Sequence, residues 1–134
     1  MIVGIDPGTR RVGIAVADEE TRFARPLEVV DTTVTDAVAR IAALTRELGV
    51  TKIVIGRPVG LSGLAGPAVE AQQSFVAAVR EAVEVDVVEH DERLTSVLAE
   101  RGLRAAGVRG AARKELRDAV AAQVMLQGYL DGGG

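Results

Sequence analysis

Two kinds of hydrophobic pattern alternate along this chain. Short segments rich in valine and isoleucine predict strands, and they lie at 2–5, 12–16, 24–30, 51–56 and 85–89. Longer segments with apolar residues at helical spacing predict helices, and they lie at 34–48, 67–83, 92–106 and 113–130. We expect Thr32 or Thr33 to cap the first helix and Gly49 to end it.

The order of these segments predicts an α/β fold with a five-stranded mixed sheet and helices on both faces. The first three strands should form an antiparallel meander, while the first, fourth and fifth should pair in parallel through right-handed crossovers. The length of 134 residues suits one domain, expected over 1–131, with a flexible tail at 132–134. In such sheets the functional crevice lies beyond the carboxyl ends of the parallel strands.

Acidic residues stand at three places that this topology can bring to that crevice. Asp6 ends the first strand, Asp91 and Glu92 follow the fifth strand, and Asp118 lies on the last helix. Small residues follow Asp118 at 119–122 and would let this helix approach the sheet closely. Carboxylates that crowd together repel one another unless a cation is held between them. Their convergence would therefore indicate a metal site.

Each acid alone also has a purely structural explanation. Asp6 can form an Asx turn with the Pro-Gly that follows it, Asp91 can cap a helix, and Asp118 can be an ordinary helix charge. His90 is better explained as a strand-end residue than as a general base. Only the joint placement of the acids favours chemistry.

The composition restricts the kind of metal site and the kind of protein. There is no cysteine and a single histidine, so a metal would have to be held by carboxylates, as Mg²⁺ or Mn²⁺ is. No apolar run reaches the roughly 18 residues of a membrane span, and no leader-like segment precedes the first strand. We therefore expect a cytoplasmic protein without a membrane partner.

The net charge of −3 gives no argument for a nucleic-acid partner, but positive charge is concentrated late in the chain. This basic cluster contains Arg101, Arg104, Arg109, Arg113, Lys114 and Arg117. It is either a solvated helical face or a surface that contacts phosphates.

Three motifs together resemble one family. They are GIDPGTRRVGIAV at 4–16, HDERLTS at 90–96, and DAVAA at 118–122 with LQGYL at 126–130. In these motifs the chain resembles the YqgF/RuvX family of Holliday-junction resolvases, also described as nucleases that mature the small-subunit ribosomal RNA precursor. The resemblance covers essentially the whole chain, to residue 131, and it implies a compact RNase H-like fold.

The resemblance also implies roles for particular residues. The family carries metal-binding acids at positions that correspond to Asp6, to Asp91 and Glu92, and to Asp118, and we favour Glu92 over Asp91 as the ligand. The backbone of the nucleic acid would be contacted by Arg10, Arg11, Arg57, Arg93, Thr95, Arg109, Arg113, Lys114 and Arg117. The family's Gly-Leu-Pro and Asp-Gly pair after the fourth strand are replaced here by GRPVGLSGLAG at 56–66, which affects substrate preference more than reaction class.

The sequence thus predicts a nuclease that uses Mg²⁺ or Mn²⁺ to hydrolyse phosphodiester bonds. The main predicted substrate is RNA, at the 5′ end of the 16S ribosomal RNA precursor. One alternative is a resolvase that acts on branched DNA, which would require a homodimer with two-fold symmetry. Another is a nucleic-acid-binding module without catalysis. A lobe of an actin-like ATPase is excluded by length, because that architecture needs two such domains.

Overall fold

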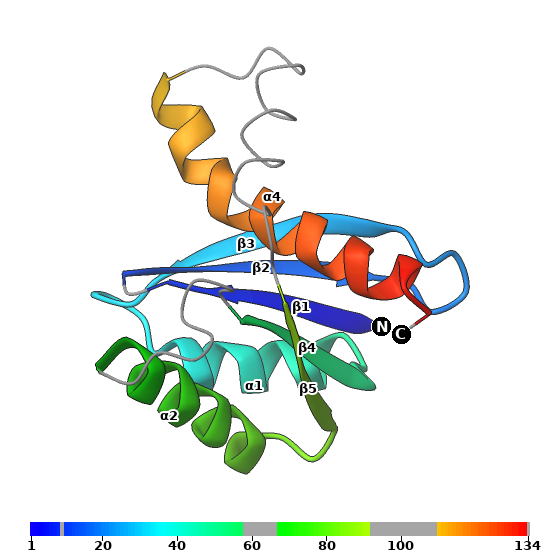
Figure 1. Cartoon of the computed structure of the whole chain (residues 1–134), viewed down its shortest axis with the longest axis horizontal. Coiled ribbons are helices and arrows are strands. Elements are labelled where there is room, and N and C mark those ends of the chain that lie inside the picture. The colour runs from blue at the N-terminus through cyan, green and yellow to red at the C-terminus, as the bar shows by residue number, and fades with distance from the viewer. Residues whose placement is uncertain (9, 58–66, 92–109, 134) are drawn as a thin grey trace.

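A computed structural model of the chain describes residues 1–8, 10–57, 67–91 and 110–133. The loop predicted at 57–66, apart from Arg57, and the helix predicted at 92–106 lie outside these residues. The described parts form a single sheet flanked by helices on both faces (Figure 1).

The sheet has five strands in the order β3-β2-β1-β4-β5. The strands are β1 (Ile2–Pro7), β2 (Arg11–Ala17), β3 (Ala24–Asp31), β4 (Lys52–Arg57) and β5 (Asp86–Asp91). The pairs β1–β2 and β2–β3 are antiparallel, whereas β1–β4 and β4–β5 are parallel. The predicted mixed sheet is therefore confirmed.

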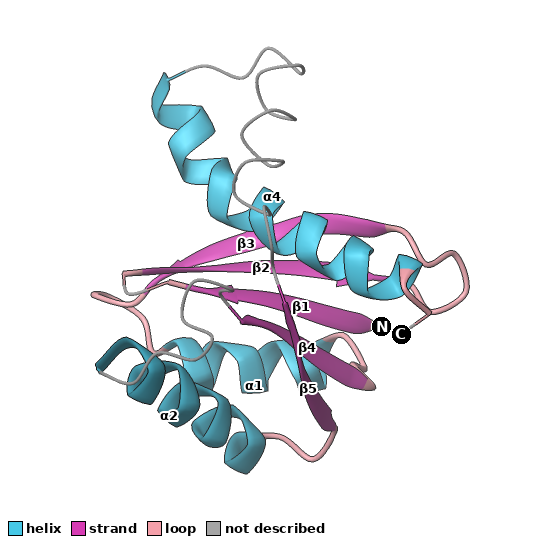
Figure 2. Ribbon diagram, in the orientation of Figure 1, coloured by secondary structure: helices cyan, strands magenta, loops and turns pink. Residues whose placement is uncertain are grey.

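The two faces of the sheet carry different helices. Helices α1 (Ala37–Glu47) and α2 (Pro67–Ala82) cover one face, and α4 (Gly110–Asp131) runs across the other (Figure 2). Alternate residues of each strand supply the two cores, as strand geometry requires. Ile5, Ile53 and Ile55 pack with α1 and α2, while Ile2 and Val54 pack with α4.

Helix α4 lies unusually close to the sheet. A Cβ atom placed on Gly4 would stand 2.7 Å from the Cβ atom of Leu126, a separation that real side chains do not tolerate. Leu126 and Met125 are fully buried against this part of the sheet. The absence of a side chain at Gly4 thus allows α4 to sit directly on β1.

Several predicted boundaries are wrong, and the start of α1 is the clearest case. The helix begins after Asp36, whose side chain accepts a hydrogen bond of 3.2 Å from the amide of Ala39, so neither Thr32 nor Thr33 is the cap. Val34, predicted to open the helix, is 80% exposed. The predicted stop is confirmed, because Gly49 has a φ of +62° directly after the helix.

The other boundary differences are smaller. Helix α4 begins at Gly110, three residues before the predicted start, and β5 continues to Asp91 rather than ending at Glu89. In the part of the chain that the structure describes, no helix combines the length and the apolar character needed to cross a membrane.

Candidate functional site

Charged residues collect at one edge of the sheet. Because β1, β4 and β5 are parallel, their carboxyl ends share this edge, and β4 and β5 end there with Arg57 and Asp91, which are register partners. Strand β2 runs the other way and begins at the edge with Arg11, opposite Asp31 at the end of β3. The predicted crevice beyond the strand ends is therefore surrounded by charge.

Asp6 is the penultimate residue of β1 at this edge. Its side chain is half-buried, and its register partner across the β1–β2 ladder is Gly13. Side chains alternate between the two faces of a strand, so Asp6 lies on the same face as Gly4, which is the face covered by α4.

Gly13 brings Asp118 to Asp6. A Cβ atom on Gly13 would overlap the main-chain carbonyl oxygen of Asp118, so α4 crosses β2 in direct backbone contact at this point. Since Gly13 is the partner of Asp6, the two acids lie at neighbouring positions although they are far apart in sequence. The structure thus brings together two of the predicted site acids.

The carboxylate of Asp118 is only partly satisfied. Its Oδ2 atom lies 3.2 Å from Nε of Arg11, which makes an ion pair by distance. Yet the N–H of Arg11 is not aligned for a hydrogen bond, and Oδ2 is a solvent-shielded oxygen without a hydrogen-bond donor among the described residues. A buried acceptor in that state is typically destabilising by about 1–3 kcal/mol. An oxygen of this kind is suited to a cation.

Comparison with known proteins identifies the family of this chain. A family model described as "RuvX: Holliday junction resolvase" matches residues 1–132. The chain belongs to this family.

Relatives of this chain align with it over almost its whole length. A protein of Chloroflexus aggregans named "Putative pre-16S rRNA nuclease" is 45% identical over 131 residues, which cover 97% of this chain and 92% of that protein. A protein of Bacillus cereus with the same name is 41% identical over 133 residues, with 97% of each chain covered.

A solved structure shows the same fold. The RuvC protein of Thermus thermophilus, in complex with a Holliday junction substrate, matches with a TM-score of 0.60 and 20% identity, and the match covers 98% of this chain and 95% of that chain. The chain is therefore a RuvX-family nuclease on an RNase H-like fold. Membership of this nuclease group implies dependence on a divalent metal ion.

The structure supports part of a metal-binding set. The backbone of Asp118 lies beside Gly13, the register partner of Asp6, and the orphaned Oδ2 of Asp118 fits a cation. Among the described residues no three acidic or histidine side chains are grouped closely enough to hold a metal. Glu92, the third predicted ligand, lies outside those residues, and Asp91 is the last residue of β5.

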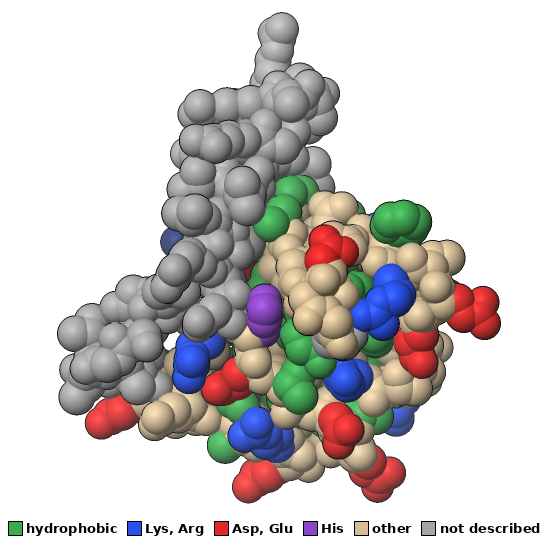
Figure 3. All heavy atoms as spheres, turned by 45° about the vertical axis from the view of Figure 1, so that its right-hand side comes forward, with side chains coloured by type: hydrophobic (Ala, Val, Ile, Leu, Met, Phe, Trp, Pro, Cys, Tyr) green, Lys and Arg blue, Asp and Glu red, His purple; other side chains and the backbone are tan. Residues whose placement is uncertain are grey.

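The predicted phosphate-binding residues are scattered. Arg93, Thr95 and Arg109 lie outside the described residues, whereas Arg113, Lys114 and Arg117 belong to the first half of α4. Arg10 is exposed, and Arg57 at the end of β4 is half-exposed, 4.0 Å from the carboxylate of Glu89. On the face shown in Figure 3, the described acidic and basic side chains alternate and form no patch of a single sign.

His90 and Tyr129 have a structural arrangement that the sequence did not reveal. The ring of His90 meets the ring of Tyr129 edge-on, with centroids 5.5 Å apart. Nζ of Lys52 donates a hydrogen bond of 3.2 Å to the Tyr129 hydroxyl. These contacts link the last turns of α4 to β4 and β5.

Two residues beside the candidate site differ from the prediction made from the sequence. Asp31 faces Arg11 across the β2–β3 ladder and was not singled out, although an acid followed by two threonines at a strand end is a turn signal. Arg11 was predicted to contact nucleic acid, and in the structure its charge is directed to Asp118.

Proposed function

We propose that this RuvX-family nuclease acts on RNA and processes the 5′ end of the precursor of 16S ribosomal RNA in the cytoplasm. Two relatives that are 45% and 41% identical carry a name for this activity, and both align over almost their whole length. The structural observation that carries the proposal is the backbone contact between Gly13 and Asp118, because it holds Asp118 beside Asp6.

The residues proposed to hold Mg²⁺ or Mn²⁺ are Asp6, Asp118 and Glu92, with Asp91 as the alternative to Glu92. When bound, such ions would activate a water molecule and stabilise the charge that develops on the leaving oxygen. The chain's own contribution is geometric. The ladder pairing of β1 with β2 fixes Asp6, and the contact at Gly13 fixes the helix that carries Asp118, so the backbone holds the two acids at neighbouring positions.

The substrate backbone would approach along the carboxyl edge of the sheet. Arg57 at the end of β4 and the basic residues in the first half of α4 flank this edge, and their guanidinium and ammonium groups are suited to phosphate oxygens. The residues proposed for this contact are Arg10, Arg57, Arg93, Thr95, Arg109, Arg113, Lys114 and Arg117. Binding should weaken as salt concentration rises.

The decisive experiment compares wild type with Asp6→Asn and Asp118→Asn on a labelled precursor-like RNA, with Mn²⁺, with Mg²⁺ and with a chelator. Each substitution should lower the cleavage rate by at least about 100-fold, because even residues that merely support a metal ligand are worth 10–100-fold. Chelation should abolish cleavage by the wild type. Asp18→Asn is the matched control, since Asp18 bonds the amide of Glu20 in the turn after β2, at the other end of the sheet.

Undiminished cleavage by Asp6→Asn or Asp118→Asn would refute the site. Separate Asp91→Asn and Glu92→Gln variants assign the third ligand, and we expect the larger loss from Glu92→Gln. Wild-type protein that binds RNA but cleaves nothing under any metal condition would favour the non-catalytic alternative.

Branched DNA is the second candidate substrate, because the matching family model is described as a Holliday junction resolvase. A synthetic four-way junction is therefore included beside the RNA. Symmetric cleavage of two opposed strands would favour this alternative, and it would require a two-fold dimer, which sedimentation or mass photometry would detect.

A further inference from the structure

Arg11 lies between two carboxylates that come from different elements. Asp118 approaches from α4, with its Oδ2 atom 3.2 Å from Nε of Arg11. Asp31 is the register partner of Arg11 at the end of β3. The alternating pattern places Val12 and Val30 in the core beneath α1, so Arg11 and Asp31 share the opposite face, where α4 lies. Directly opposed residues on one face are neighbours.

The contact with Asp118 is electrostatic rather than directional. Arg11 balances the charge of this carboxylate but leaves Oδ2 without a hydrogen bond, as described above. The side chains are 39% exposed for Arg11 and 22% for Asp118, so both groups are partly exposed although the Oδ2 atom itself is shielded from solvent. A pair of this kind is weak, and a competing cation can displace it.

The carboxylate of Asp31 is ionised and held in a fixed position, so it can pair with a positive charge. It accepts hydrogen bonds from the amide and the hydroxyl of Thr33, at 2.9 and 2.6 Å, and both use Oδ1 rather than Oδ2. These hydrogen bonds, and to a smaller extent the charges of Arg10 and Arg11, hold the pKa of Asp31 below its ordinary value. The carboxylate is therefore ionised at neutral pH and fixed in position by the turn.

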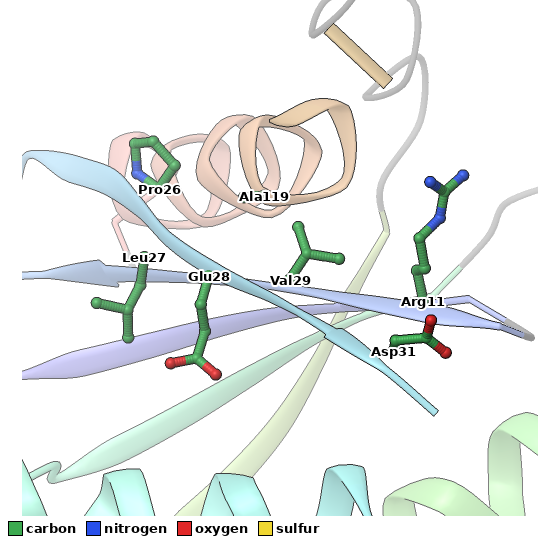
Figure 4. A pocket seen from close by; sticks show the side chains of 7 residues that line it. All are labelled: Arg11, Pro26, Leu27, Glu28, Val29, Asp31 and Ala119. Carbon is green, nitrogen blue, oxygen red and sulfur yellow. The ribbon is translucent and has the colours of Figure 1, made fainter. Parts of the chain in front are cut away.

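A cleft of about 430 Å³ gives Arg11 room to move. It is lined by Arg11, Asp31, Pro26, Val29 and Ala119, together with Leu27 and Glu28 (Figure 4). In Figure 4 the guanidinium of Arg11 points towards α4, while the carboxylate of Asp31 lies near the base of the same side chain. An irregularity in the β2–β3 register between Ile14 and Ala15 shapes this part of β3.

We infer that Arg11 is a built-in counter-cation of the metal site: it pairs with Asp118 while no metal is bound, and it turns to Asp31 when a divalent ion takes up Asp118. This inference rests on the proposed function, since it requires Asp118 to be a metal ligand. A divalent ion and a guanidinium at the same carboxylate repel each other, so the guanidinium must leave. Asp31 provides the position to which it moves and is thus a positioning residue.

The test measures Mn²⁺ binding without substrate, by titration calorimetry and by the rise in melting temperature on adding Mn²⁺. Arg11→Gln should bind Mn²⁺ roughly two- to fivefold more tightly than wild type, which is the range expected for loss of one partly exposed competing ion pair. Its metal-free melting temperature should fall, because Asp118 loses its partner. A purely structural role for Arg11 would lower that temperature without tightening metal binding.

Arg10→Gln is the matched control. It removes the same charge from the adjacent position, while its main-chain carbonyl keeps the hydrogen bond of 2.9 Å from the Thr32 amide. Any general effect of net charge on Mn²⁺ affinity appears in this variant too. The inference is overturned if Arg11→Gln gains no more affinity than Arg10→Gln.

Asp31→Asn gives an independent measurement, since an Asn can still accept the bonds from Thr33. It should weaken Mn²⁺ binding about two- to fivefold in the wild-type background, and have much less effect when Arg11 is already Gln. Equal effects in both backgrounds would also overturn the inference.

The proposed metal site has its own test in the same titrations. Wild type should bind Mn²⁺ and Asp118→Asn should not; if Asp118→Asn does not abolish Mn²⁺ binding, or wild type binds none, the proposed metal site fails. If Mn²⁺ binding depends on Asp118 but Arg11→Gln does not tighten it, only the inference about Arg11 is overturned and the proposed function stands.

Discussion

Two segments of α4, one near its C-terminus and one at Asp118, are attached to the sheet in opposite ways. Towards its C-terminus, side chains and main chain form several directed hydrogen bonds. Gln127 accepts from the Ala24 amide at 2.8 Å and donates to the Arg22 carbonyl at 3.0 Å, and Arg22 donates to the Leu130 carbonyl at 2.9 Å. At Asp118 the helix touches the sheet backbone to backbone, with one weak ion pair and one unsatisfied oxygen.

This difference separates the segment that anchors α4 from the segment that carries the proposed site. The hydrogen bonds near Gln127, together with buried Leu126 and Leu130, keep the helix in place. The segment at Asp118 can therefore keep a polar atom without a hydrogen bond, which would be unfavourable in a helix held at that point alone. Unsatisfied groups in native structures are commonly found where a ligand completes them.

The largest effect should come from Gly13→Ala, which acts where α4 contacts β2 at Asp118. The added methyl group would overlap the carbonyl of Asp118, so α4 must shift away from β2. We expect a loss of about 2–3 kcal/mol in unfolding free energy, together with a strong loss of cleavage, because Asp118 moves with the helix. Urea denaturation and the RNA cleavage assay measure the two effects. Wild-type stability in this variant would mean that the close contact is not present in solution.

A smaller effect should follow from Gln127→Ala at the anchoring end. The substitution removes both hydrogen bonds that join this side chain to the β2–β3 connection. We expect a loss of about 1–2 kcal/mol, with cleavage preserved at a temperature where the variant is folded. Gln123→Ala removes one bond, to the Ala24 carbonyl at 3.1 Å, and should show about half the loss. A selective loss of activity in Gln127→Ala would contradict the separation of the anchoring segment near Gln127 from the proposed site at Asp118.

Gly128→Ala should raise the stability of the protein, in contrast to Gly13→Ala. A Cβ atom there would meet only Nε2 of His90, at 3.9 Å, which is an ordinary contact. Alanine is a better helix former than glycine, so α4 should gain up to about 1 kcal/mol. The melting temperature should rise by about 3–5 °C, without a change in cleavage. It is also the matched control for Gly13→Ala, since both exchange glycine for alanine in elements that touch. Destabilisation would show that the helix has no room at this end.

The smallest expected effect is on the pH dependence of stability, through the carboxylate of Asp31. Hydrogen bonds from Thr33 place the folded-state pKa of Asp31 below that of an unfolded chain. Asp31 therefore contributes stability above the ordinary carboxyl pKa of about 3.9. This contribution is lost as the pH falls through the lower pKa of the folded state. Thr33→Val should raise the pKa of Asp31, measured by NMR titration, and reduce stability at neutral pH but not in strong acid. An unchanged pKa would mean that the turn does not hold this carboxylate.

Much of the fold could be predicted because strand and helix patterns are local. The order of strands follows from short apolar segments and from the handedness of crossovers. The start of α1 could not be predicted this way. Thr33 was a reasonable cap by residue type, but its hydroxyl bonds Asp31 in a turn, and Asp36 takes the role instead. Residue type alone does not decide between several capping residues in one short segment.

The candidate site was predictable only in part, for a similar reason. Asp6 stood out as an acid at a strand end and Asp118 as an acid followed by small residues on the last helix, and the family motifs supported both. That Gly13 is the point at which α4 meets the sheet depends on where a helix crosses a strand, which no local pattern encodes. The pairing of Arg11 with Asp118, and the place of Asp31 beside it, depend on the same long-range packing.

The junction at Gly13 also bears on when the enzyme becomes active. Asp6 precedes Asp118 by more than a hundred residues, so it is synthesised well before the helix that carries the second acid. A nascent chain still lacking that helix has Asp6 and the hairpin but no partner acid. If the proposed site is the catalytic one, hydrolytic capacity should thus arise only once α4 has left the exit tunnel and docked, and a chain without this helix should not cleave RNA.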